Sequence, residues 1–174
     1  MPTQAAIDSA KALLEICTRK QLTVATAESC TGGLVAAAIS EISGSSAVLD
    51  RGFVPYSNEA KQQMLGVARS TIETFGAVSR ECAEEMAMGA LGRASVALAV
   101  SITGIAGPTG AVPGKPIGLV FFCAASRGGR VVANECRYGD IGRANVRTQS
   151  VLQALAMLRE LAEKEAPGAG TRSR

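Results

Sequence analysis

The chain has 174 residues, a formal net charge of +3 and a hydrophobic fraction of 47%. This length is sufficient for one domain with a sizeable core, and the basic residues form no long block, so composition gives little support to a nucleic-acid partner. The sequence contains no histidine, which excludes Ser-His-Asp and Cys-His catalysis. Without histidine or clustered cysteines it also shows no zinc pattern.

Cysteine usage and the N-terminal segment indicate the compartment. Five cysteines without paired spacing, and no signal peptide, favour a reducing cytoplasm. Ile7, Ala10 and Leu14 lie on one face of an amphipathic helix, which a secretory signal does not form. No apolar run reaches the length that spans a bilayer. We therefore expect a cytoplasmic protein with no membrane partner.

Hydrophobic periodicity and turn residues predict alternating helices and strands in the first half of the chain. They are a helix at 4–19, a strand at 22–27, a helix at 31–42, a strand at 48–56 and a short helix at 58–65. Pro55 has no N–H to give to a ladder, so the strand that contains it is expected at a sheet edge or a bulge.

The second half of the chain predicts more strands, joined by longer connections. Its elements are a helical turn from Ser70, a helix at 79–93, a strand at 95–101, a glycine- and proline-rich loop at 103–116, hairpin strands at 117–125 and 130–138, and a last helix ending near 165. This order implies a mixed sheet with helices on both faces, a three-layer α/β/α sandwich. We expect one domain over 1–166 and a disordered tail at 167–174.

The loop at 103–116 resembles nucleotide-binding loops but matches neither common template. Thr109 stands where the first glycine of a Walker A loop belongs, and Pro116 replaces the Ser or Thr that would hold magnesium. The glycines of this loop also have the wrong spacing for the dinucleotide fingerprint. We therefore expect no metal and no cofactor.

A turn at 27–33 joins an apolar strand to a helix, an arrangement whose backbone N–H groups can hold an anion. Cys30 lies in this turn, and without a histidine partner it is read as a packing residue. The candidates for substrate binding in the turn are Ser29, Thr31, Gly32 and Gly33.

In the absence of histidine, serine chemistry with a lysine base remains. Outside the termini the candidate bases are Lys61 and Lys115. Lys61 lies where a strand end leads into a helix, the position at which α/β proteins bind ligands. From spacing alone, however, Lys61 also fits a solvated helix position, and Ser46 fits an ordinary turn. Ser57 is a competing nucleophile because it lies four residues before Lys61 on the same helix.

Six sequence blocks, in order along the chain, carry a resemblance to a known family. They are AESCTGG at 27–33, GSSA at 44–47, RGFVPYSNEAK at 51–61, GAVS at 76–79, TGIAGP at 103–108 and KPIGLV at 115–120. They resemble the CinA C-terminal domain family over about residues 5–163. The chain is similar to the stand-alone form, without the extra N-terminal domain of full-length CinA.

The resemblance implies metal-free hydrolysis of the carboxamide of nicotinamide mononucleotide, giving nicotinic acid mononucleotide and ammonia. It implies Ser46 as the nucleophile, Lys61 as its base, and Tyr56 as a residue that positions the lysine or the carboxamide. Hydroxyl and backbone donors near the developing oxyanion would come from the loop at 103–107. These donors are Thr103, Gly104 and Gly107.

The substrate phosphate needs its own site, for which Arg143 and Arg147 are candidates beside the turn at 27–33. Their i, i+4 spacing puts them on one helix face, and guanidinium groups suit phosphate. In the alternative they pair with Asp140 or face solvent. Low polarity of the outer helix faces favours a homo-oligomer. The competing functions are a non-catalytic nucleotide-binding regulatory module linked to competence or DNA damage, and amide hydrolysis of another substrate.

Overall fold

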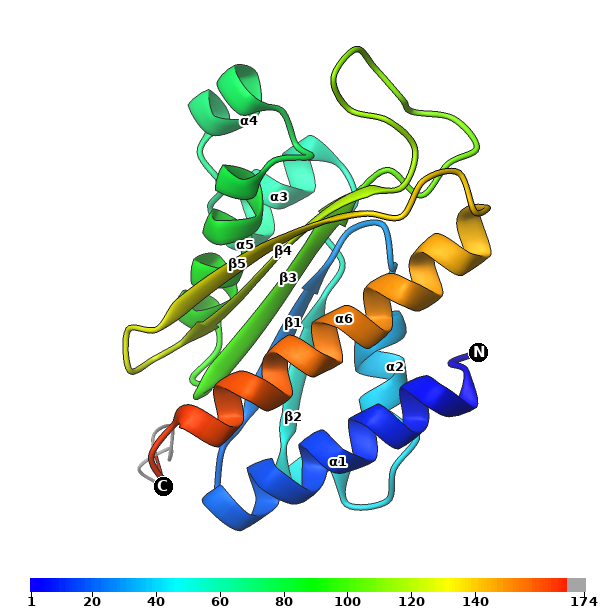
Figure 1. Ribbon diagram of the computed structural model, residues 1–174. Helices are drawn as coiled ribbons and strands as arrows, with labels where there is room; N and C mark the ends of the chain where they lie inside the picture. The colour runs from blue at the N-terminus through cyan, green and yellow to red at the C-terminus, as the bar shows by residue number, and fades with distance from the viewer. Residues whose placement is uncertain (169–174) are drawn as a thin grey trace.

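The computed structural model describes residues 1–168, which form one five-stranded sheet with helices on both faces (Figure 1). The elements are α1 (Gln4–Lys20), β1 (Val24–Glu28), α2 (Leu34–Ser40), η1 (Ser45–Ala47), β2 (Leu49–Phe53), α3 (Asn58–Leu65), α4 (Arg69–Phe75), α5 (Arg80–Arg93), β3 (Leu98–Gly104), β4 (Leu119–Ser126), β5 (Val131–Arg137) and α6 (Arg143–Lys164). The predicted α/β/α sandwich is confirmed.

The sheet is mixed, in the order β2-β1-β3-β4-β5. β1 runs parallel to both β2 and β3, whereas β4 and β5 form an antiparallel hairpin beside β3. The carboxyl ends of the three parallel strands therefore meet at one edge of the sheet. We call this edge the carboxyl edge, and open α/β sheets bind their ligands there.

Two hydrophobic layers hold the helices on the sheet. α1, α2 and α6 cover one face, where Leu13 and Leu155 pack with Phe122. α3, α4 and α5 cover the other face, where Leu65 of α3 and Met86 of α5 belong to one buried cluster. This packing fixes α3, and with it the lysine that α3 carries, against the carboxyl edge.

Several element boundaries differ from those that the sequence predicts. β3 extends through Thr103 and Gly104, which pair with Phe121 and Val120 of β4. The expectation that these two residues belong to a loop is therefore wrong, because the ladder with β4 continues past the apolar run. β2 ends at Phe53 and is an edge strand of the sheet, as the missing N–H of Pro55 predicts.

α2 begins later than predicted, at Leu34, because Gly32 and Gly33 have positive φ values of 61° and 92°. At the other end of the chain, α6 is capped by the Lys20 ammonium, which donates to carbonyl oxygens of Ala162, Glu163 and Glu165 at 3.0, 2.6 and 2.9 Å. A cation at these carbonyls also complements the helix dipole.

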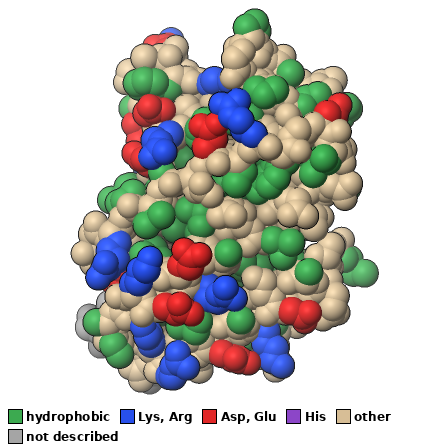
Figure 2. All heavy atoms as spheres, in the orientation of Figure 1, with side chains coloured by type: hydrophobic (Ala, Val, Ile, Leu, Met, Phe, Trp, Pro, Cys, Tyr) green, Lys and Arg blue, Asp and Glu red, His purple; other side chains and the backbone are tan. Residues whose placement is uncertain are grey.

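Of the predicted tail, Gly168 lies in a turn and its N–H donates to Lys20 O at 2.8 Å. Residues 169–174 lie outside the described residues. Within residues 1–168, no helix combines the length and the apolar composition that crossing a membrane requires. On the face that α1 and α6 cover, acidic and basic side chains are interspersed (Figure 2), so this face is neither a positively nor a negatively charged patch.

Candidate active site at the carboxyl edge

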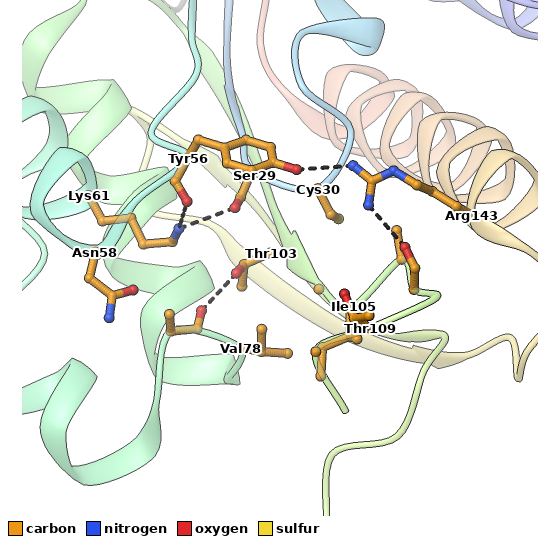
Figure 3. Close-up of a pocket in the computed structure, with 15 residues that line it drawn as sticks. Ser29, Cys30, Tyr56, Asn58, Lys61, Val78, Thr103, Ile105, Thr109 and Arg143 are labelled. Atoms are coloured by element: carbon orange, nitrogen blue, oxygen red, sulfur yellow. Dashed lines mark hydrogen bonds between the residues drawn. The ribbon is translucent and has the colours of Figure 1, made fainter. Parts of the chain in front are cut away.

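A cavity of about 250 Å³ opens at the carboxyl edge of the sheet (Figure 3). Its walls come from the turn after β1, the connection from β2 into α3, the connection between α4 and α5, the end of β3 with the loop that follows it, and the start of α6. Segments far apart in the sequence thus contribute to one concave site, as expected for a small-molecule pocket.

Lys61 is the most unusual side chain of this cavity. It is only 2% exposed, and its Nζ donates to Ser29 Oγ at 3.2 Å and to Pro55 O at 3.0 Å, with a longer contact of 3.4 Å to Tyr56 O. Burial lowers the pKa of the Lys61 ammonium from its ordinary value of 10.5, and interactions with the Cys82 and Cys30 thiols oppose part of this shift. A buried lysine of this kind is suited to accept a proton.

Ser29 is held firmly at the end of β1. Its N–H donates to Ile102 O at 2.9 Å, and its carbonyl accepts from the Gly32 N–H at 3.0 Å. The sequence indicated Ser29 as a binding residue but missed its pairing with Lys61. The available signal was topological: Ser29 follows one strand and Lys61 follows the next, and parallel neighbours end at the same edge.

The two serines that the sequence favoured as nucleophiles lie elsewhere. Ser46 is an exposed residue of η1, which precedes the amino end of β2, so it lies at the opposite edge of the sheet from the cavity. Ser57 is the N-cap of α3, and its Oγ accepts from the Ala60 N–H at 3.0 Å. Within this chain the structure brings neither hydroxyl to the Lys61 ammonium.

The predicted anion-holding turn already contains an anion, which belongs to the chain itself. The carboxylate of Glu28 is fully buried and accepts a hydrogen bond from Thr26 Oγ1 at 3.0 Å. It also accepts from the backbone N–H groups of Gly33, Val35 and Ala36 at 3.1, 3.0 and 2.9 Å. The Gly33 N–H, which the sequence offers to a substrate, is therefore already engaged within the chain, because this carboxylate occupies the helix N-terminus.

Of the other turn residues, Ser29 and Cys30 line the cavity, whereas Thr31 and Gly32 do not. Cys30 is 5% exposed, and burial raises the pKa of its thiol to about 12. It therefore stays a protonated thiol in the cavity wall, in agreement with its interpretation as a packing residue.

Arg143 bridges the mouth of the cavity. Its guanidinium donates to Gly107 O at 3.1 Å and to Tyr56 Oη at 3.0 Å (Figure 3). The Tyr56 side chain is 57% exposed and points toward Arg143, while its carbonyl faces Lys61. These contacts connect the three loops that surround the opening.

Arg147 lies one turn further along α6 and does not line the cavity. Its guanidinium donates to Thr31 O at 2.9 Å and so supports the turn that carries Ser29. In residues 1–168 neither Arg143 nor Arg147 forms an ion pair with Asp140.

The remaining predicted donors come from the end of β3 and the loop that follows it. Thr103 is buried and its hydroxyl donates to Ala77 O at 2.7 Å. Gly104 and Gly107 line the cavity, and no acceptor for the Ala106 or Gly107 N–H is found among the described residues. In the same part of the chain, no group of three or more Cys, Asp or Glu side chains is arranged to hold a metal ion.

The fold and the cavity together define an α/β protein with a small-molecule pocket at its carboxyl edge, built around a buried serine–lysine pair. The chain belongs to the CinA C-terminal domain family, whose model matches residues 7–162.

Similar proteins agree with this membership. The nicotinamide-nucleotide amidohydrolase PncC of Escherichia coli (strain K12) is 53% identical over 137 residues, which are 78% of this chain and 82% of that protein. A putative competence-damage inducible protein of Thermoanaerobacter pseudethanolicus is 46% identical over 147 residues, which are 84% of this chain and 35% of the longer relative. The crystal structure of the competence/damage inducible protein CihA from Agrobacterium tumefaciens covers 92% of this chain and 98% of that one, with 51% identity and a TM-score of 0.91.

Proposed function

We propose that this protein is a nicotinamide mononucleotide deamidase, which hydrolyses the carboxamide to nicotinic acid mononucleotide and ammonia. The observation that carries the proposal is the buried Lys61 ammonium at 3.2 Å from Ser29 Oγ inside a pocket of suitable size. A relative that is 53% identical is named a nicotinamide-nucleotide amidohydrolase, which supports the same reaction.

In the proposed mechanism Ser29 is the nucleophile and neutral Lys61 is its base. Lys61 takes the hydroxyl proton as Ser29 Oγ attacks the amide carbon, and a tetrahedral oxyanion forms. The C–N bond then breaks, and the departing NH₂ group takes that proton from Lys61 and leaves as ammonia. Water, deprotonated by Lys61, attacks the acyl ester, and the proton returns to Ser29 as the acid is released. The lowered pKa of Lys61 favours the neutral amine that both steps require.

Backbone donors for the oxyanion are available in the loop that follows β3. The unpaired N–H groups of Ala106 and Gly107 are the candidates, because the Thr103 hydroxyl already donates to Ala77 O. One well-aimed donor of this kind typically contributes about 10² to 10³ in rate. Gly104 and Tyr56 then have positioning roles in the wall and at the mouth.

The substrate phosphate binds at the mouth, where Arg143 is exposed. The α2 N-terminus is unsuited to the phosphate because the Glu28 carboxylate already occupies it. Arg147 supports the turn after β1 and has a positioning role. With the phosphate at Arg143, the pyridine ring lies deeper, against Val78 and Ile105.

Ser46 remains the nucleophile that the family resemblance implies, whereas the geometry within this chain favours Ser29. The two assignments differ in the serine whose replacement by alanine abolishes turnover. A homo-oligomeric state and a cytoplasmic location remain predictions from the sequence.

Ammonia release from nicotinamide mononucleotide by the purified protein, with and without a chelator, tests the proposal. We expect release that the chelator does not reduce. Absence of release contradicts the enzymatic function, and binding of the mononucleotide without turnover favours a regulatory module instead. Release that stops in the chelator contradicts the metal-free mechanism.

A further inference from the structure

The connection between α4 and α5 is held by an unusual set of side-chain donors. Four consecutive carbonyl oxygens, from Phe75 to Val78, each accept a hydrogen bond from a side chain. Gly76 O accepts from Ser79 Oγ at 2.8 Å and Ala77 O from Thr103 Oγ1 at 2.7 Å. Phe75 O and Val78 O both accept from the ammonium of Lys115, the latter at 2.7 Å.

Lys115 fits this place closely. Phe75 is the last residue of α4, so its carbonyl lies at a helix C-terminus, where a cation is favourable. Gly76 has a φ of +83°, and a Cβ there would lie 2.6 Å from Lys115 Nζ. Glycine at this position therefore leaves space for the ammonium as well as permitting the backbone conformation.

The same lysine belongs to the long loop between β3 and β4, at 105–118. Near its tip this loop closes a tight turn, in which Val112 and Lys115 exchange backbone hydrogen bonds of 3.1 and 2.9 Å. Thr109 and Gly110 of the loop line the cavity, as do Ala77 and Val78 of the connection. The Lys115 ammonium therefore ties together two segments that line the cavity.

A second cation holds the other side of this loop. Arg143 donates to Gly107 O, at the near end of the loop, while Lys115 anchors its far end. Lys115 itself does not line the cavity, and its ammonium faces carbonyl oxygens. It therefore does not have the position of a base, although the sequence offers it as one.

We propose that Lys115 is a positioning residue that sets the width of the cavity by clamping the loop at 105–118 to the connection at 76–79. The proposal rests on the proposed deamidase function for its kinetic consequence. The clamp itself is independent of that function. Loss of the clamp widens the cavity and weakens binding of the mononucleotide, while the distance between Ser29 and Lys61 is kept by β1, β2 and α3.

Kinetics and hydrogen exchange of Lys115→Met test the clamp, with Lys11→Met as the matched control because Lys11 is an exposed lysine of α1. For Lys115→Met we expect KM for nicotinamide mononucleotide to rise about tenfold and kcat to change less than about threefold. Amide exchange should become faster at 75–79 and 105–118 and stay unchanged elsewhere. Lys115→Arg, which keeps the charge and the donors, should raise KM less than Lys115→Met does. The control should match the wild type in every measurement.

If Lys115→Met leaves both KM and amide hydrogen exchange unchanged, the proposed clamp is overturned. A decrease in kcat with no change in KM would overturn it as well. If Lys115→Met does not fold, Lys115→Gln, which keeps one donor group, gives the same comparison. Should the wild-type protein release no ammonia, the proposed function fails, and the exchange measurement alone still decides whether Lys115 holds the two segments together.

Discussion

The two ends of the parallel strands differ sharply, although each carries a serine in a short turn. At the carboxyl edge, Ser29 contacts the buried ammonium of Lys61. The opposite edge of the sheet, where the parallel strands begin, is the amino edge. Ser46 is exposed there, and no hydrogen bond of its hydroxyl is found within residues 1–168. The chemistry of a serine hydroxyl depends on a partner that can take its proton. Among residues 1–168, the carboxyl edge supplies that partner to Ser29, and the opposite edge supplies none to Ser46.

Topology explains the difference. The residues that follow β1, β2 and β3 converge at the carboxyl edge, so a serine from one turn meets a lysine that follows the neighbouring strand. η1 instead leads into the amino end of β2, beside the start of β1 at Val24. Ser46 is exposed there, and none of the described residues takes the proton of its hydroxyl.

The largest expected effect is on the serine of the carboxyl edge. Ser29→Ala should lower kcat for ammonia release by about 10⁴, because the nucleophile is lost. Ser46→Ala, the matched variant at the amino edge, should stay within about threefold of the wild type, as surface substitutions usually do. Steady-state kinetics with nicotinamide mononucleotide measure both.

The opposite pattern would restore the assignment that the family resemblance implies. If Ser46→Ala is inactive and folded while Ser29→Ala keeps its turnover, Ser46 is the nucleophile. The proton transfer to Lys61 would then need an arrangement that the described residues of one chain do not form.

Replacing the base Lys61 should lower kcat somewhat less than replacing Ser29. Lys61→Gln removes the proton acceptor but keeps a polar side chain near Ser29, so kcat should fall by about 10³, within the range typical of a general base. Lys11→Gln, at an exposed lysine of α1, is the control. A Lys61→Gln protein that is folded by circular dichroism and still active would argue against Lys61 as the base.

The pH dependence follows from the lowered pKa of Lys61. The amine accepts a proton only when it is neutral, so kcat/KM should rise with pH along a limb whose midpoint lies below 10.5, the ordinary lysine value. In the unfolded chain Lys61 regains that ordinary pKa. Between the two pKa values the unfolded chain binds more protons, and stability therefore increases with pH.

Urea unfolding across that interval measures the stability effect, and Lys61→Met should remove it. The kinetic limb must disappear in the same variant. A wild-type limb at or above 10.5 would mean that burial does not favour the neutral amine.

Local sequence patterns predict the layers of this fold because each helix and strand carries its own apolar period, as in β1 and α6. The candidate site is harder to predict from the sequence, because its main contacts join residues that are far apart in the chain. Nothing next to Glu28 in the sequence indicates that its carboxylate turns back to cap α2. The convergence of Ser29 and Lys61 depends on the pairing of β1 with β2, which periodicity alone does not specify. The sequence predicts Thr103 to be a site residue in a loop, whereas Thr103 lies in β3, since the ladder with β4 is also a distant pairing.

The internal anion at the carboxyl edge should contribute measurably to stability. In Glu28→Gln, one carboxylate oxygen becomes an NH₂ group that faces backbone N–H donors of α2, so buried donors lose their acceptor. We expect a loss of about 2 kcal/mol in the free energy of unfolding. Glu15→Gln, at an exposed position of α1, should change it by less than about 0.5 kcal/mol. Equal stabilities in urea would show that the capping hydrogen bonds contribute little.

The smallest expected effect is at the mouth of the carboxyl edge, where Arg143 is exposed and already donates to Gly107 O and Tyr56 Oη. An exposed guanidinium contributes less than a buried pair, so Arg143→Gln should raise KM for nicotinamide mononucleotide by about tenfold with kcat nearly unchanged. The KM for nicotinamide riboside, which lacks the phosphate, should change little or not at all in the same variant. As a control, Arg159→Gln on the exposed face of α6 should leave the KM of both substrates unchanged. An equal loss with both substrates would assign Arg143 to the shape of the opening through its contacts with Tyr56 and Gly107. In that case the phosphate would be bound by another group.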